Sequence, residues 1–137
     1  MSERFRFRVW DKPLEKYMEF KEFKFMNVEF TFNPITKEAE IEYDKERYIV
    51  EQSVGLKDKN GKLIYEGDIV KQFNNHGRLL RVGYIVYNEK EMKFKIREER
   101  CPDWNEKTDD FTFHPLKQML LVIGNIHQNQ ELLKEEE

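Results

Sequence analysis

The side chains best suited to metal binding or nucleophilic catalysis are three histidines and one cysteine, which lie far apart in the chain. They are His76, His114, His127 and Cys101. No CxxC, HxH or HExxH spacing places two of them on one element, so the sequence predicts no metal site. Cys101 lies in a loop rich in Asp and Glu, and nearby carboxylates disfavour the nucleophilic thiolate. We therefore expect an inert thiol and no cofactor.

Two pairs of carboxylates have the right chemistry for acid–base catalysis. Glu66 and Asp68 would share a strand face, but Gly67 between them argues against a regular strand. Asp109 and Asp110 are adjacent, and no His or Lys converges on either pair. Walker, Rossmann and serine-nucleophile motifs are absent from the sequence. The sequence therefore predicts a non-enzymatic protein. An enzyme whose site leaves no linear motif is the less favoured alternative.

The strongest candidate for a binding function is a basic and aromatic stretch in the middle of the chain. Residues 57–100 hold 11 Lys and Arg against 7 Asp and Glu, whereas residues 101–137 hold 3 against 8. Proteins that bind single-stranded nucleic acids combine such cations with aromatic rings. The same pattern suits the solvent face of amphipathic strands, so both interpretations stay open. The residues of this candidate nucleic-acid face are Arg78, Arg81, Tyr84, Tyr87, Lys93, Lys95 and Arg97.

Composition restricts the class of protein further. A chain of 137 residues predicts one domain, and 11 Phe, 6 Tyr and 2 Trp are typical of a folded core. A net charge of −3 argues against a binder that relies mainly on electrostatic attraction to nucleic acid. The apolar runs are too short to span a membrane, and the first residues lack the apolar core of a signal peptide. A single cysteine favours a reducing cytoplasm.

Alternation of apolar and polar residues predicts a mainly β protein. Phe5, Phe7 and Val9 alternate with three arginines, and a turn at Asp11-Lys12-Pro13 would begin a hairpin. Short strands punctuated every 8–12 residues indicate a small barrel. We expect further strands near residues 17–20, 41–43, 48–54, 63–65, 69–70, 80–86, 92–96, 111–113 and 120–126. In the segment 80–86, the apolar face is expected to be that of Leu80, Val82, Tyr84 and Val86.

Turn residues separate these strands. Asn60-Gly61 predicts a type I′ hairpin turn, in which both central residues have positive φ. Gly67 is expected to allow a sharp bend into the following strand. Asp58 and Asp68 are expected to bond backbone N–H groups in their own turns. Another turn signal lies at Asn33-Pro34.

The C-terminal residues suggest one closing turn of helix. Asn129 is a suitable N-cap for this turn, which would run through Leu132 and Leu133. At least one of these two leucines is expected to pack on the barrel.

A concentration of phenylalanines near the N-terminus has two interpretations. These rings could close the open side of the barrel or form a second small core with Phe5, Phe7 and Trp10, or they could mediate contact between two copies of the chain. The phenylalanines concerned are Phe20, Phe23, Phe25, Phe30 and Phe32.

Three stretches resemble motifs of the YopX-like proteins of phages and prophages. The segment 54–70, VGLKDKNGKLIYEGDIV, resembles the signature block of that family. The opening FRFRVWD at 5–11 is similar to its FRxWD pattern, and residues 122–133 resemble its closing GNIYENPELL motif. His127 and Gln130 stand where the family motif has tyrosine and proline. The matches follow the family's order along nearly the whole chain.

The resemblance implies an SH3-type β-barrel at residues 48–137, preceded by a β-rich segment at residues 1–47. The resemblance implies no established activity, cofactor or catalytic residue for this chain. It implies a phage or prophage accessory protein in the cytoplasm of a bacterial host. We expect this protein to bind a macromolecule, either a phage or host protein or, alternatively, a nucleic acid. The motif residues to which we assign structural roles are Asn60, Gly61, Gly67, Asp68, Gly124 and Asn125.

Overall fold

The computed structural model describes residues 6–19, 22–23, 26, 28–98, 109–111 and 119–133. Within these ranges the regular elements are antiparallel strands and short 3₁₀ turns, which confirms the prediction of a mainly β protein. No helix in these ranges has the length and apolar character needed to cross a membrane. The elements are β1 (Phe7–Asp11), β2 (Lys16–Tyr17), β3 (Glu29–Asn33), β4 (Glu38–Glu42), β5 (Tyr48–Lys57), β6 (Leu63–Tyr65), β7 (Asp68–Phe73), β8 (Leu79–Asn88), β9 (Lys93–Glu98), β10 (Asp109–Phe111), β11 (Met119–Asn125) and the 3₁₀ turn η3 (Gln130–Leu133).

The chain divides into two compact units. Unit 1 comprises Met1–Phe7 and Gln52–Glu137, and unit 2 comprises Arg8–Glu51. The change from unit 2 to unit 1 falls inside β5, between its fourth and fifth residues. The division at residues 47 and 48 that the sequence suggests stays a prediction.

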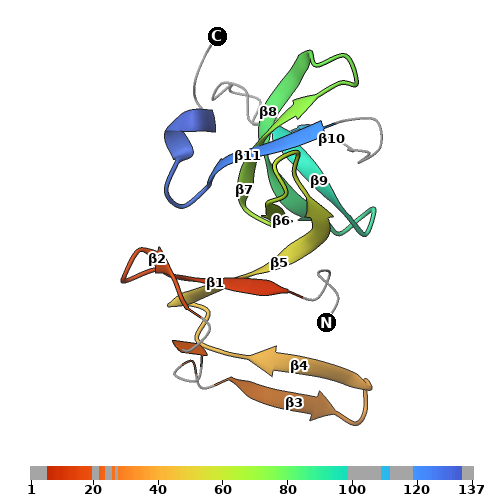
Figure 1. The fold of residues 1–137 in the computed structure, drawn as a ribbon. Helices are drawn as coiled ribbons and strands as arrows, with labels where there is room; N and C mark the ends of the chain where they lie inside the picture. Colours follow the sequence, from red (N-terminus) through yellow and green to blue (C-terminus); the bar gives the residue numbers. More distant parts are fainter. Residues whose placement is uncertain are drawn as a thin grey trace, which may run out of the picture. The chain divides into compact units, whose positions relative to one another are not determined.

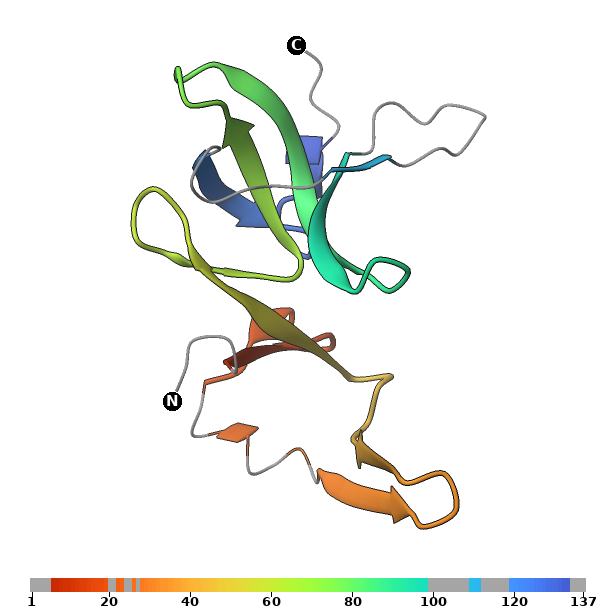
Figure 2. The ribbon, with the colours of Figure 1, turned by 90° about the vertical axis from the view of Figure 1, so that its right-hand side faces the viewer.

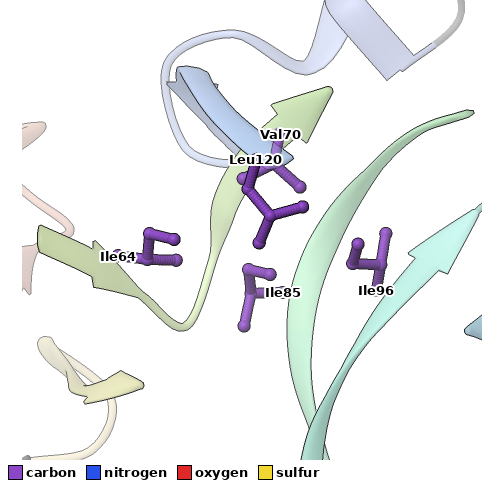
Figure 3. Close-up of a cluster of buried hydrophobic side chains, with 5 residues drawn as sticks. All are labelled: Ile64, Val70, Ile85, Ile96 and Leu120. Carbon is purple, nitrogen blue, oxygen red and sulfur yellow. The ribbon is translucent and has the colours of Figure 1, made fainter. Parts of the chain in front are cut away.

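Unit 1 is built on a five-stranded antiparallel sheet in the order β10-β9-β8-β7-β11, here called the curved sheet. It curls into a half-barrel (Figures 1 and 2). Its inner face packs against β6, so apolar side chains from five strands meet in one core (Figure 3). Burial of each such side chain contributes about 1.5–3 kcal/mol. The core residues are Ile64, Val70, Ile85, Ile96 and Leu120.

The core uses the face of β8 opposite to the one that the sequence suggested. Ile85 is fully buried and lies opposite Ile96 in β9, whereas Tyr84 is only half-buried. Gly83 brings β8 close to β9: a Cβ there would lie 2.5 Å from the carbonyl oxygen of Arg97. Since β8 is apolar on both faces, alternation alone does not identify the inner one.

The loop between β5 and β6 is not a type I′ turn, so that prediction is wrong. Gly61 has a φ of 85°, but Asn60 does not have positive φ. The N–H of Gly61 donates to the carbonyl oxygen of Asp58, at 2.9 Å. The carboxylate of Asp58 also accepts the N–H groups of Asn60 and Lys62, at 2.9 and 2.8 Å. These bonds favour a longer loop that begins at Asp58.

Unit 2 contains the predicted N-terminal hairpin and a small second core. Trp10 in β1 pairs with Tyr17 in β2, which confirms the hairpin. The core consists of Val9, Met26 and Tyr48, with Phe23 packed against it. The expectation that Phe7 joins such a core is wrong, because 50% of its surface is exposed. Phe5, Phe20 and Phe25 lie outside the described residues, as do the side-chain positions of Phe30.

The strands β3 and β4 of unit 2 form a separate two-stranded sheet (Figure 1). Its turn begins at Asn33, as the sequence predicted. The side-chain oxygen of Asn33 accepts the N–H of Ile35 at 2.9 Å, and its carbonyl oxygen accepts the N–H of Lys37 at 2.8 Å. The strands are in register from Glu29 opposite Glu42 to Asn33 opposite Glu38.

At the C-terminal end, the predicted closing turn is present as η3, directly after Asn129, but the side chain of Asn129 does not bond to this turn. Its side-chain oxygen accepts the N–H of Asn125 at 3.1 Å, before the 3₁₀ turn η3 and not inside it. The carbonyl oxygen of Asn129 accepts the N–H of Leu132 at 2.9 Å, as that of an N-cap residue does, so only the side-chain part of the cap prediction is wrong. Leu132 and Leu133 are half-buried, and their packing on the barrel stays a prediction.

Candidate functional site

The candidate nucleic-acid face is divided between two faces of the curved sheet and a turn. Residues that lie opposite each other in neighbouring strands share a face. Arg81 and Tyr87 are opposite Gln72 and Phe94, on the inner face. Arg78 lies in the exposed turn before β8. The remaining residues are on the outer face, and these are Tyr84, Lys93, Lys95 and Arg97.

Two cations of the outer face share one carboxylate. The ammonium group of Lys95 is paired with Glu91, and that of Lys93 lies 3.7 Å from the same carboxylate. Only 9% of the Lys95 side chain is exposed. The hydrogen bond from Lys95 is the main reason that the pKa of Glu91 lies below its ordinary value. Lys95 is thus largely buried and partly neutralised, which weakens its case as a phosphate contact.

On the inner face, Arg81 is fixed by an aromatic ring and an amide. Its guanidinium carbon lies 3.8 Å from the ring centroid of Phe111, and it donates a hydrogen bond to the side-chain oxygen of Gln72. Gln72 is fully buried. These contacts hold Arg81 against the sheet, on the face opposite to Arg97.

The residues with predicted structural roles come together from two distant parts of the sequence. Asp68 at the start of β7 lies opposite Asn125 at the end of β11. The carbonyl oxygen of Gly67 accepts the N–H of Ile126, and the N–H of Gly67 donates to Ile85, both at 2.9 Å. The signature block and the closing motif therefore meet in unit 1. Gly124 lies beside Asn129, where a Cβ would be 2.5 Å from the side-chain oxygen.

The paired carboxylates considered for catalysis bind backbone groups. Glu66 accepts the N–H of Gln52, and Asp68 accepts the N–H of Tyr65, both at 2.9 Å. Among the described residues, no three His, Cys, Asp or Glu side chains gather in a way that could hold a metal ion. Several of the sequence candidates lie outside the described part of the chain, namely Cys101, His114 and the side chains of Asp109 and Asp110.

The most exposed apolar surface of unit 2 lies on the hairpin formed by β3 and β4, which we call the acidic hairpin. Phe32 is 62% exposed, and Ile35 in the turn is 89% exposed. Val28, just before β3, is 41% exposed. In the described chain, β3 and β4 pair only with each other. This hairpin therefore presents apolar side chains and, at the edge of β4, no second strand neighbour among the described residues.

The polar side of the acidic hairpin is strongly negative. Residues 29–42 contain four glutamates and one lysine, a net charge of −3. Glu29 and Glu42 lie directly opposite each other, and like charges in such a pair destabilise a sheet. A cationic group placed beside them would relieve this repulsion.

A hollow of about 390 Å³ adjoins the Glu29–Glu42 pair. One cation at this hollow is already engaged: the guanidinium of Arg47 lies 3.0 Å from a carboxylate oxygen of Asp11. The hydrogen bond to Asp11 is the main cause that raises the pKa of Arg47 above its ordinary value. The hollow is lined by Met26, Glu29, Glu42, Tyr43, Asp44, Arg47 and Tyr48.

These features define an antiparallel β protein that has a half-barrel and an acidic, partly apolar hairpin. The model of the YopX protein family matches residues 6–134, and the chain belongs to that family. Among solved structures it is similar to protein EF1440 from Enterococcus faecalis, at 26% identity and a TM-score of 0.48, covering 94% of this chain and 97% of that one. It is also similar to protein yopX from Bacillus subtilis, at 17% identity and a TM-score of 0.47, covering 93% and 97%. Curated proteins give no match.

Proposed function

We propose that this protein is a non-enzymatic module that binds another protein, and that the acidic hairpin is its docking surface. The observation that carries this proposal is a hairpin that has no third strand among the described residues and that leaves Phe32 and Ile35 largely exposed. An isolated two-stranded hairpin is only marginally stable in water. Exposed apolar patches on strand edges are typical of interaction sites. A partner would cover the apolar side chains and pair with the open edge of β4.

We further propose the cellular setting that membership of the YopX family suggests. The protein would be a phage or prophage accessory protein that acts in the cytoplasm of a bacterial host. The half-barrel of unit 1 would then be an SH3-type barrel. The curvature and the antiparallel order of the five-stranded sheet support this proposal.

Nucleic-acid binding is a second candidate function. It is favoured by Tyr84 and Arg97, which lie opposite each other on the outer face of the curved sheet. It is weakened by the pairing of Lys95 with Glu91. A gel shift with single-stranded and double-stranded DNA and RNA at several salt concentrations tests it. Salt-dependent binding that Arg97→Ala abolishes would favour this candidate over protein binding.

Site-specific photo-crosslinking in the bacterial cells that express the protein tests the main proposal. A photoreactive amino acid replaces Ile35 in one variant and Leu14 in the control, since Leu14 is also exposed in unit 2 but lies in another turn. We expect a discrete heavier adduct only from position 35, and we expect Phe32→Ser to remove it. The same adducts from both positions, or none from position 35, would overturn the proposal. An adduct made of two copies of this chain would replace it with self-association.

A further inference from the structure

We propose that the partner of the acidic hairpin presents an extended segment in which Lys or Arg alternates with apolar residues, and that this segment adds to β4 as a third strand. This inference rests on the proposed function, because it specifies the chemistry of the protein that docks there.

The backbone of β4 supplies the first part of the recognition. In the described chain its only strand neighbour is β3, so one edge of β4 has no strand partner. An extended segment that joins such an edge gains main-chain hydrogen bonds, while its alternate side chains determine specificity. The exposed Phe32 lies on the face of the hairpin opposite to Glu38 and Glu42, and the apolar residues of an added strand would continue that face.

The charges of β4 supply the second part. Glu38 and Glu42 are exposed and four positions apart, so they share one face of the strand. Glu29, opposite Glu42, adds a third carboxylate to that face. Cations at every other position of an added strand would lie beside these carboxylates. The apolar residues between the cations would lie on the other face of the sheet. Long cationic side chains suit this place, because they bury their stems and keep the charge near the acids.

The hollow beside Glu42 supplies the third part. Asp44, Tyr43 and Tyr48 line it together with the Glu29–Glu42 pair. Carboxylates attract a Lys or Arg head group. The two tyrosine rings already face cations of this chain, since Lys45 lies 5.8 Å from the ring centroid of Tyr43 and Arg47 lies 5.2 Å from that of Tyr48. This hollow would hold the terminal cation of the added strand.

A second copy of this chain fits the surface less well. Two β4 edges would bring their glutamates together, and like charges opposite each other are unfavourable. The chain's own alternating cationic strands are β1 and β9, and each already lies between two other strands. The occupant is therefore a segment of a different protein.

The binding of three synthetic heptapeptides, measured by fluorescence anisotropy with the full chain, tests this inference. The first is Lys-Val-Lys-Val-Lys-Val-Lys, the second has Glu in place of Lys, and the third has Ser in place of Val. We expect saturable binding of the first peptide, binding about tenfold weaker for the serine peptide, and none for the glutamate peptide. Higher salt should weaken the binding of the first peptide. Equal binding of all three, or no binding of the first, would overturn the inference.

Matched variants locate the binding on the hairpin. Glu38→Gln combined with Glu42→Gln should weaken binding of the lysine peptide about tenfold, whereas Glu46→Gln, in an exposed loop, should leave it unchanged. Phe32→Ser should weaken it as well, and Leu14→Ser should not. Since these side chains are exposed, the variants are expected to fold, and circular dichroism checks this. Equal losses in the test and control variants would contradict docking on β4.

Failure of this inference can be separated from failure of the proposed function. If the lysine peptide does not bind but position 35 still crosslinks to another protein, the partner's chemistry is wrong and the docking surface stands. If position 35 gives no adduct, the docking surface itself is wrong.

Discussion

The carboxylate of Asp58 accepts the backbone N–H of Val122 at 2.9 Å, although 64 residues separate them in the sequence. Beside this bond, the N–H of Lys59 donates to the carbonyl oxygen of Leu120, also at 2.9 Å. Asp58 is 7% exposed. One buried side chain therefore both shapes its own loop and fastens that loop to β11. This bond joins the signature block to the closing motif.

Replacement of Asp58 by Asn should destabilise unit 1. An amide has one acceptor oxygen and cannot serve all three N–H donors, so a buried donor is left unsatisfied. We expect the free energy of unfolding to fall by about 1–3 kcal/mol, measured by urea denaturation. Asp44→Asn is the control, because Asp44 is exposed and accepts the N–H of Glu46 in its own loop. Equal stability of the Asp58 variant and the wild type would show that this carboxylate does not hold the loop.

The contribution of Asp58 should depend on pH. Burial raises its pKa, but hydrogen bonds from the N–H groups of Val122, Lys62 and Asn60 outweigh burial, so the pKa lies below its ordinary value of 3.8. A carboxyl group with a lowered pKa in the folded state stabilises the fold above its unfolded pKa. That stability is lost as the pH falls through the folded pKa. The stability difference between wild type and Asp58→Asn should be constant near neutral pH and shrink below about pH 4. A difference that grows on acidification would contradict this account.

Replacement of Glu51 by Ala should destabilise unit 2. Its carboxylate is buried, and one oxygen accepts both the Arg8 side chain at 2.8 Å and the Tyr17 hydroxyl at 2.9 Å. Removing it leaves a largely buried guanidinium without this partner, at a cost of about 2–4 kcal/mol. Thermal unfolding measures the loss, with the exposed Glu46→Ala as control. Glu51→Gln should lose less, since it keeps an acceptor, and similar losses for Glu51→Ala and Glu46→Ala would refute the prediction.

Replacement of Gly61 by Val should destabilise the loop between β5 and β6. A Cβ at this position meets no atom within 4 Å, so any loss comes from backbone strain at a φ of 85° and not from a clash. A β-branched residue there should cost about 1–3 kcal/mol. Gly61→Asn should cost less, because Asn tolerates the left-handed region. An unchanged melting temperature in the valine variant would mean that this conformation is not required.

Local sequence signals predicted many of the strands, and long-range pairing explains most of what they missed. The turn at Asn33 and the hairpin between Trp10 and Tyr17 follow from neighbouring residues. The bond from Asp58 to Val122 cannot be seen in a local pattern, because it depends on how β11 returns to the sheet. Tertiary packing also selected the inner face of β8.

The candidate sites also depended on long-range pairing that local sequence patterns do not reveal. Basic and aromatic residues are close together in the sequence from Arg78 to Arg97, but strand alternation sends Arg81 and Arg97 to opposite faces. The acidic hairpin was only partly visible, as a turn followed by a weak strand. Its alternating glutamates, at positions 38, 40 and 42, were the signal that would have identified an acidic strand face.

The central claim is that β4, whose only strand neighbour in the described chain is β3, gains a second one on binding. Hydrogen exchange of its backbone amides, followed residue by residue by NMR, tests this claim most directly. In the free protein, amides of β3 and β4 should exchange much faster than those of β7 and β8, because each of the latter strands lies between two neighbours in the curved sheet. Addition of the Lys-Val heptapeptide should slow exchange in β4 and leave β7 unchanged. Amides of the free hairpin that are already as protected as those of β7 would contradict the account.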